Sequence, residues 1–321
     1  MKYRQLGRSA LRVSQLCLGT MNFGPRTLEE ESFAILSDVV EAGINFIDTA
    51  NQYGGHLGVG ISEAIIGRWL AQDKSRRNRI VLATKVFEPM SDDVNDRGLS
   101  ARHIQQACDA SLKRLNVEHI DLYQMHHIDR TARNEEIWLA MDRLIAQGKI
   151  TYVGSSNFPG WKIAQMSEQA MARRHLGLVS EQSVYNLIER RAELEVIPAC
   201  QEYGVGVITW SPLAGGLLVG DDLDHAVRRQ SKPVMAAAAA RAKQLTQFAS
   251  LCREHGDAPG AIALAWGLHQ DGIAATIIGP GDRAQLASIL HAPDIHLDAQ
   301  TLAEIDAIFP ACGPAPEAYA W

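Results

Sequence analysis

The sequence predicts a (β/α)8 TIM barrel with an N-terminal β-hairpin and extra C-terminal helices. Eight short apolar runs recur along the 321 residues, separated by amphipathic stretches with apolar side chains at every third or fourth position. Regular alternation of strand and helix is typical of parallel strands covered by helices on the outside. No linker rich in glycine or proline interrupts the series. We therefore expect one domain over residues 1–321 and a closed barrel rather than an open sheet.

The expected elements follow one another in chain order. Residues 3–13 alternate around Gly7 and predict a hairpin that plugs one end of the barrel. The strands are then expected at residues 15–18, 45–47, 80–83, 120–123, 150–153, 178–180, 205–209 and 275–278. Helices are expected at residues 27–42, 62–71, 100–115, 134–146, 160–174, 192–203 and 259–269.

Local signals support several helix boundaries. Thr27 and Glu30 have the spacing of a capping box at the start of the first helix, and Ser100 is a residue type that caps helix N-termini. Gly43 and Gly148 stand where helices are expected to stop, because glycine readily adopts the left-handed conformation that ends a helix.

One connection is unusually long. Residues 215–233 are polar and exceed the length of an ordinary loop in this fold, which is typical of a lid or a binding loop. An alanine-rich helical pattern follows over residues 235–255.

Composition excludes several classes of function. Lys and Arg number 31 against 37 Asp and Glu, a net charge of −6 with no long basic run, so nucleic acid and anionic membranes are not expected partners. Residues 1–19 lack the apolar core of a secretory signal, and no run approaches the roughly 20 apolar residues of a membrane span. We expect a soluble, cytoplasmic protein.

The cysteines carry no pattern of a disulfide framework or a zinc site. They are scattered, with no CxxC pair and no Cys/His cluster, so no metal is expected. We expect buried, reduced thiols at Cys17, Cys108, Cys200, Cys252 and Cys312.

Side chains with acid–base chemistry follow three consecutive expected strands. Asp48 and Tyr53 come after the second strand, Lys85 after the third and His126 after the fourth. The C-terminal ends of barrel strands meet at one rim, so these side chains are expected to converge there.

Together, these residue types make a proton donor for a carbonyl oxygen. A phenol with an ordinary pKa of about 10 becomes a usable acid near neutral pH when an ammonium stabilises its anion. We expect Lys85 to lower the pKa of Tyr53, and Asp48 to keep Lys85 charged. A neutral His126 can orient the carbonyl and donate a hydrogen bond as negative charge develops on its oxygen.

The segments that contain these residues resemble signatures of the aldo-keto reductase superfamily, in the expected order over nearly the whole chain. The matching segments are DTANQYG at 48–54, ATK at 83–85, LYQMH at 122–126 and GSSNF at 154–158. Three further segments are similar to the bacterial branch related to potassium-channel β subunits: SEAIIG at 62–67, WSPLAGGLL at 210–218 and IIGP at 277–280.

The resemblance implies an NAD(P)H-dependent oxidoreductase that reduces an aldehyde or ketone to an alcohol, or runs the reverse oxidation, by direct hydride transfer. Asp48, Tyr53, Lys85 and His126 would form the catalytic tetrad, with Tyr53 as general acid/base. The alternative is a cofactor-binding redox sensor or a module like a channel β subunit, with little turnover.

The resemblance also implies the cofactor contacts. Ser156, Asn157 and Gln182 would bind the nicotinamide carboxamide, and Trp210 would stack on the ring and leave one face open. The other contacts would be Gly19, Thr20, Met21, Asp48, Ser211, Pro212, Leu213, Gly215, Gly279, Arg283 and Gln285. The sequence has no GxGxxG after the first strand, as expected for a fold that does not use the Rossmann loop.

The adenine end departs from the pattern of the relatives. Gly281 stands where a basic or hydroxyl residue is common, Ile289 replaces an Asn, and Asp221 replaces a lysine. The lost cation weakens the case for a phosphorylated ribose, because charge-assisted contacts are among the stronger ones. Arg283 is the candidate substitute, so we expect NADP(H), with NAD(H) as the alternative.

The substrate pocket is expected to combine apolar walls with a few polar groups, which suits a bulky aldehyde, ketone or cyclic alcohol. Its lining would be Met21, Phe23, Phe87, Met90, His127 and Trp210. The expected partner is a small molecule, and homo-oligomer formation is left open. Hydrolase or lyase chemistry is disfavoured, because the sequence has no GxSxG motif, paired catalytic carboxylates or metal-ligand spacing.

Overall fold

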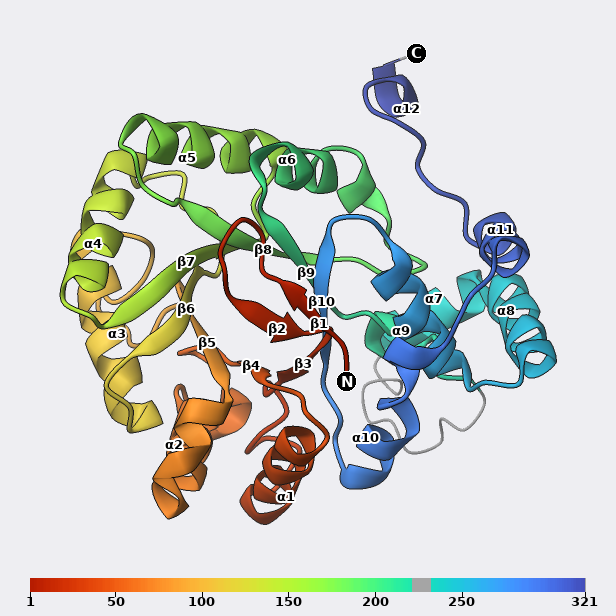
Figure 1. The fold of residues 1–321 in the computed structure, drawn as a ribbon, viewed down its shortest axis with the longest axis horizontal. Helices are drawn as coiled ribbons and strands as arrows, with labels where there is room; N and C mark the ends of the chain where they lie inside the picture. The colour runs from red at the N-terminus through yellow and green to blue at the C-terminus, as the bar shows by residue number, and fades with distance from the viewer. Residues whose placement is uncertain (221–231, 321) are drawn as a thin grey trace.

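The computed structural model describes residues 1–220 and 232–320 and contains a closed barrel with the strand order β10-β3-β4-β5-β6-β7-β8-β9. All neighbouring strands pair in parallel, and helices surround them (Figure 1). The strands are β3 Leu16–Gly19, β4 Phe46–Asp48, β5 Val81–Val86, β6 Ile120–Met125, β7 Ile150–Ser156, β8 Leu178–Val184, β9 Gly206–Trp210 and β10 Ile273–Ile278. The predicted (β/α)8 fold is confirmed.

The outer layer consists of helices that surround the strands, most of them amphipathic. These helices are α1 Glu29–Glu41, α2 Ile61–Gln72, α3 Ala101–Leu115, α4 Asn134–Ala146, α5 Gly160–Ala172, α6 Val196–Tyr203, α9 Pro259–His269 and α10 Arg283–Ile289. Helix α9 is instead buried on every face. The prediction began α6 too early, at residue 192. Pro198 explains the later start, because a proline in the helix interior clashes with the carbonyl four residues before it.

The helix ends follow the predictions in three places and differ in one. The Ser100 side chain accepts from the His103 amide at 3.2 Å, and Gly43 and Gly148 adopt φ of +86° and +69° after α1 and α4. The expected capping box is wrong. Leu28 occupies the N-cap of α1, and the Thr27 hydroxyl instead donates to the Gly281 carbonyl at 3.0 Å.

The N-terminal hairpin closes one end of the barrel, as predicted. Strands β1 Tyr3–Gln5 and β2 Arg12–Ser14 pair in antiparallel fashion and lie across the barrel end that faces the viewer in Figure 1. Leu6 and Val13 are fully buried against apolar side chains of the barrel strands. Gly7 allows this close approach, because a Cβ there would lie 2.3 Å from the Val179 carbonyl oxygen.

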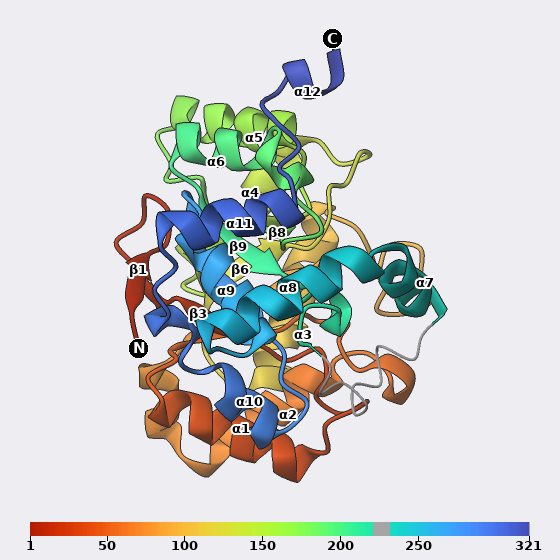
Figure 2. The same cartoon turned by 90° about the vertical axis from the view of Figure 1, so that its right-hand side faces the viewer.

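The segment after β9 contributes two helices, α7 Lys232–Ala240, which lies at the side opposite β1, and α8 Ala242–His255, which runs from there across the barrel toward the side of β1 (Figure 2). The single helical pattern predicted over 235–255 is thus broken at Arg241, whose φ of −118° is not helical. Residues 221–231, most of the predicted lid, lie outside the described residues, as does Asp221.

The predicted extra C-terminal helices are α11 Ala299–Ile308, which packs on α8, and α12 Glu317–Ala320, which projects from the barrel (Figures 1 and 2). The cysteines are buried except Cys312, which is exposed, so the prediction of burial was wrong for that residue. Among the described helices, none combines the length and apolar character needed to cross a membrane.

Candidate active site

Several barrel strands extend at their C-terminal ends beyond the apolar runs that predicted them. The additional residues are polar. Strand β5 includes Lys85, which pairs in register with Gln124 of β6, and Ser156 of β7 pairs with Gln182 of β8. Asp48 is the last residue of β4. Because the backbone hydrogen bonds of the sheet fix each of these residues, their side chains have little freedom to diverge.

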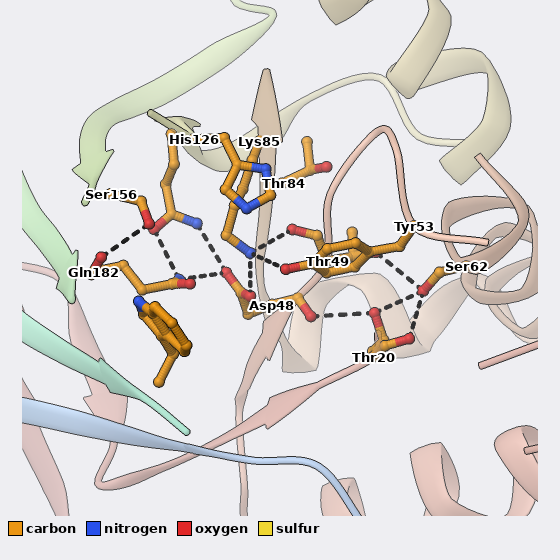
Figure 3. Close-up of polar contacts among 12 residues, drawn as sticks. Thr20, Asp48, Thr49, Tyr53, Ser62, Thr84, Lys85, His126, Ser156 and Gln182 are labelled. Atoms are coloured by element: carbon orange, nitrogen blue, oxygen red, sulfur yellow. Dashed lines mark hydrogen bonds and ion pairs between the residues drawn. The ribbon is translucent and has the colours of Figure 1, made fainter. Parts of the chain in front are cut away.

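A buried ion pair lies at the centre of the site (Figure 3). Lys85 is fully buried, and its ammonium donates to the Asp48 carboxylate, to the Thr49 carbonyl at 3.0 Å and to the Tyr53 hydroxyl at 3.2 Å. Burial alone lowers the pKa of Lys85, but the charge of Asp48 and the contact with Tyr53 raise it, leaving it above the ordinary value. Lys85 therefore stays charged at neutral pH.

The second carboxylate oxygen of Asp48 is held by two amides. Gln124 and Gln182 donate their Nε2 groups to Asp48 Oδ1 at 2.8 and 2.9 Å. With both oxygens occupied, Asp48 serves to orient and charge Lys85 rather than to accept a proton. Gln124 was not predicted as part of the site. Its signal was a polar residue in an otherwise apolar strand, two positions before His126.

Tyr53 stands between Lys85 and His126. The Lys85 ammonium lies 5.0 Å from the centre of the Tyr53 ring, and the His126 ring meets the phenol edge-on at 5.9 Å and 76°. The turn that follows is tightly packed, since a Cβ on Gly54 would lie 1.8 Å from the Gly58 carbonyl oxygen. The chain around Tyr53 is therefore held in a narrow range of conformations.

His126 is neutral. Burial, the charge of Lys85 and the neighbouring His127 lower the pKa of His126 to about 2. The His126 ring stacks on His127 with centroids 4.9 Å apart, and Glu88 Oε1 lies 3.1 Å from Nε2 of His127. The structure thus brings together the four side chains that the sequence assigned to the tetrad.

A second group of predicted residues forms one hydrogen-bonded turn. Asn157 adopts the left-handed conformation, with φ of +57°. Its Nδ2 donates to the His126 carbonyl at 3.1 Å and to Ser156 Oγ at 3.0 Å, and its Oδ1 accepts from the Trp210 indole at 3.0 Å. Ser156 Oγ donates to the Gln182 carbonyl at 2.8 Å. The predicted nicotinamide contacts are therefore coupled to each other and to the backbone of His126.

The segment after β9 has an unusual backbone. Ser211, Ala214, Gly215 and Gly216 all have positive φ, between +49° and +101°, in a stretch that also contains the predicted Pro212 and Leu213. Within this stretch the Ala214 and Gly216 amides donate to the Ser211 and Leu213 carbonyls at 2.9 and 2.8 Å, and the two glycines leave the backbone without side-chain cover.

The first strand contributes residues in different environments. Gly19 approaches β10 closely, since a Cβ there would lie 2.5 Å from Ile277 Cγ2. Thr20 is fully buried with its hydroxyl 3.1 Å from the Asp48 carbonyl, whereas Met21 is 45% exposed. At the C-terminal end of the neighbouring strand β10, the Gly279 carbonyl accepts from Asn22 at 3.0 Å.

Arg283 is not a free cation. Its Nε and Nη2 lie 2.5 and 3.0 Å from the two carboxylate oxygens of Asp38, and its amide donates to Glu31 at 2.9 Å. Gln285 is occupied too, because its Oε1 accepts from the Gly281 amide at 2.8 Å. The candidate cation at the adenine end is thus already matched by a carboxylate on α1.

The residues predicted to line a substrate pocket divide into two groups. Phe87, Met90 and His127 are partly exposed, and Phe87 meets His127 edge-on at 5.4 Å. Phe23 has no exposed surface and packs in the hydrophobic core. Within residues 1–220 and 232–320, no group of three or more His, Cys, Asp or Glu side chains is placed to hold a metal ion.

Comparisons with known proteins give the same assignment as the geometry. The model of the family described as "Aldo/keto reductase family" matches residues 15–309. A Bacillus subtilis protein called uncharacterized oxidoreductase YrpG is 48% identical, with 100% of both chains covered. Versiconal hemiacetal acetate reductase of Aspergillus parasiticus is 32% identical over 84% of this chain and 85% of its own. A probable voltage-gated potassium channel subunit beta of Arabidopsis thaliana is 30% identical over 99% of this chain and 100% of its own. The chain therefore belongs to the aldo/keto reductase family of oxidoreductases.

Proposed function

We propose that the protein interconverts an aldehyde or ketone with its alcohol, using a nicotinamide dinucleotide as hydride carrier and Tyr53 as general acid/base. The observation that carries this proposal is the contact between Lys85 and the Tyr53 hydroxyl, 3.2 Å long and anchored by the buried Asp48. A half-buried phenol beside a fixed ammonium is a proton donor whose anion is stabilised where it forms.

The residues present fit a nicotinamide dinucleotide. Trp210 offers a half-buried indole fixed by Asn157, and Ser156, Asn157 and Gln182 offer amide and hydroxyl groups beside it. Gly215 and Gly216 carry no side chains, which supports a close approach of the phosphates to the backbone there. A reduced nicotinamide supplies the hydride that adds to the carbonyl carbon.

The side chains of the site then protonate and stabilise the carbonyl oxygen of the substrate. Tyr53 Oη donates its proton to the carbonyl oxygen as that oxygen gains negative charge, and Lys85 stabilises the phenolate that remains. His126, neutral throughout, donates a hydrogen bond to the same oxygen without adding charge. In the direction of oxidation the Tyr53 phenolate accepts the proton of the alcohol.

The preference for NADPH over NADH is proposed to be small. NADPH carries a further phosphate, and its expected partner, Arg283, is already paired with Asp38. Because Asp38 neutralises the Arg283 guanidinium, little net positive charge remains to attract a phosphate. NADP(H) stays the preferred cofactor of the proposal, with NAD(H) accepted at comparable affinity.

The substrate side is proposed to be formed by Met21, Phe87, Met90 and His127, with Trp210 behind them. Their mixture of apolar surface and one imidazole suits a bulky aldehyde, ketone or cyclic alcohol. Phe23 is omitted, because it offers no surface to a ligand. A cytoplasmic location and assembly with further copies stay predictions.

The decisive experiment combines cofactor titration with a panel of aldehydes, ketones and alcohols. Wild-type protein is expected to bind NADPH and to turn over at least one carbonyl, and Tyr53→Phe is expected to keep the binding and lose the turnover. Undiminished turnover by Tyr53→Phe would remove the general-acid assignment. Tight cofactor binding without turnover of any substrate would favour the alternative, a redox-sensing module like the channel subunit that the Arabidopsis relative is named for.

A further inference from the structure

Glu181 is a fully buried carboxylate behind the Asn157 turn, and the proposed chemistry does not use it. It precedes Gln182 in β8, and it makes no ion pair in the described part of the chain. Burying an unpaired carboxylate costs several kcal/mol unless hydrogen bonds replace its water. The groups that donate hydrogen bonds to Glu181 therefore indicate its role.

Two of these contacts come from the residues that flank Asn157, and the third comes from β8 itself. Glu181 Oε1 accepts from the Phe158 amide at 3.0 Å and from the Ser183 hydroxyl at 2.8 Å, and Oε2 accepts from the Ser155 hydroxyl at 2.5 Å. Burial raises the pKa of Glu181 to about 7, although these bonds lower it.

The turn itself is anchored by β8 at two successive amides. The Asn157 amide donates to the Gln182 carbonyl at 3.0 Å, and the next amide, that of Phe158, donates to the Glu181 side chain. Asn157 lies between these anchors in the left-handed conformation, which costs a residue other than glycine energy unless its surroundings hold it. Glu181 supplies the anchor on the C-terminal side, where Pro159 has no amide hydrogen to offer.

The Asn157 turn fixes the positions of groups in the proposed nicotinamide site. Asn157 Oδ1 accepts from the Trp210 indole, and Asn157 Nδ2 reaches the carbonyl of His126. If the Phe158 amide were released, the backbone at Asn157 could relax toward negative φ. The Asn157 side chain would then swing away from both partners.

We propose that Glu181 is a positioning residue, which fixes the left-handed Asn157 turn from behind and thereby sets the orientation of Trp210 and the carboxamide contacts for the cofactor. The expected effect on the cofactor rests on the proposed function, whereas the role of Glu181 in holding the turn is independent of it.

Three variants separate this role from general support of the fold. Glu181→Gln keeps an acceptor for the Phe158 amide and can donate to Ser155, Glu181→Leu removes every hydrogen bond at similar size, and Ser183→Ala removes a bond that does not reach the turn. We expect Glu181→Leu to raise the dissociation constant for NADPH by about tenfold or more, the scale of one lost hydrogen bond to a charged group. Glu181→Gln and Ser183→Ala should stay within about threefold of wild type.

The second readout needs no cofactor. Hydrogen–deuterium exchange of residues 155–160 in the protein alone should speed up by about tenfold in Glu181→Leu and stay as in wild type in Glu181→Gln. A folded Glu181→Leu with wild-type exchange and wild-type NADPH affinity overturns the inference. So does an equal loss of affinity in Glu181→Leu, Glu181→Gln and Ser183→Ala, which would indicate a generally weakened fold.

Two further outcomes keep the test decisive. If Glu181→Leu does not fold, Glu181→Asp replaces it. That variant keeps the charge but shortens the arm by one methylene, and wild-type exchange at 155–160 in it overturns the inference. If wild-type protein binds neither NADPH nor NADH, the proposed function fails, and the exchange measurement still decides whether Glu181 holds the turn.

Discussion

The Lys85 ammonium and the Tyr53 hydroxyl lie 3.2 Å apart, with the lysine fully buried and the tyrosine partly buried. Lys85 lies in β5, whereas Tyr53 lies in the loop after β4. Asp48, the last residue of β4, binds the ammonium of Lys85 and so fixes its position. The arrangement places a positive charge beside a partly exposed phenol.

Replacing Lys85 with Met should remove the charge that stabilises the Tyr53 anion. We expect the catalytic efficiency of carbonyl reduction to fall by about 10²- to 10⁴-fold, with NADPH affinity nearly unchanged. Steady-state kinetics and a cofactor titration check this. Asp48→Asn/Lys85→Met guards against misfolding, because it does not leave a buried carboxylate unpaired. Lys149→Met, which breaks a surface ion pair with Asp109, is the control, and a loss below tenfold in Lys85→Met would contradict the role.

His126 should stay neutral over the whole working range of pH. Its pKa of about 2 in the folded protein lies below the ordinary value near 6.5, so the unfolded chain binds the proton first. Stability is therefore lost as pH falls from about 6.5 toward 2, with a slope of up to about 1.4 kcal/mol per pH unit. Urea unfolding at several pH values should show a smaller acid slope in His126→Asn. An NMR titration with a midpoint near 6.5 for His126 would disprove the assignment.

Glu181 should act on stability in the opposite sense. Its pKa is raised from the ordinary 4.5 to about 7, so its contribution is favourable when protonated and is lost as pH rises from about 4.5 to 7. Glu181→Gln removes this loss and should stabilise the protein above pH 7 by up to about 3 kcal/mol. Thermal or urea unfolding at pH 5 and pH 8 measures the effect. A variant no more stable than wild type at pH 8 would show that the carboxylate is not strained by burial.

Asp38 should limit the affinity for a phosphorylated cofactor. Asp38→Asn frees the Arg283 guanidinium, so we expect the dissociation constant for NADPH to fall about three- to tenfold while that for NADH stays constant. Arg283→Ala should weaken NADPH binding alone. Glu30→Gln, exposed on the same helix and not among the charges that act on Arg283, is the matched control. Equal changes for both cofactors in Asp38→Asn would mean that Arg283 does not meet the phosphate.

Much of the barrel was predictable because its signals are local. One can count along the chain the apolar runs that form β3 to β10 and the helical patterns between them. Ser100 indicated the start of α3. One error occurred where a local signal met a distant partner. Thr27 looked like a cap, but its hydroxyl bonds the carbonyl of Gly281, 254 positions away.

The sequence by itself determined the fold and the residue types at the strand ends, since strand and helix periodicity and the place of a residue after a strand are properties of short segments. Only the tertiary structure decided which of those groups are already occupied. Gln182 and Gln124 hold Asp48 across the barrel, Asp38 neutralises Arg283 from another helix, and Glu181 holds the Asn157 turn. The physical reason is that hydrogen bonds and ion pairs join side chains brought together by barrel closure, and no periodic pattern records them.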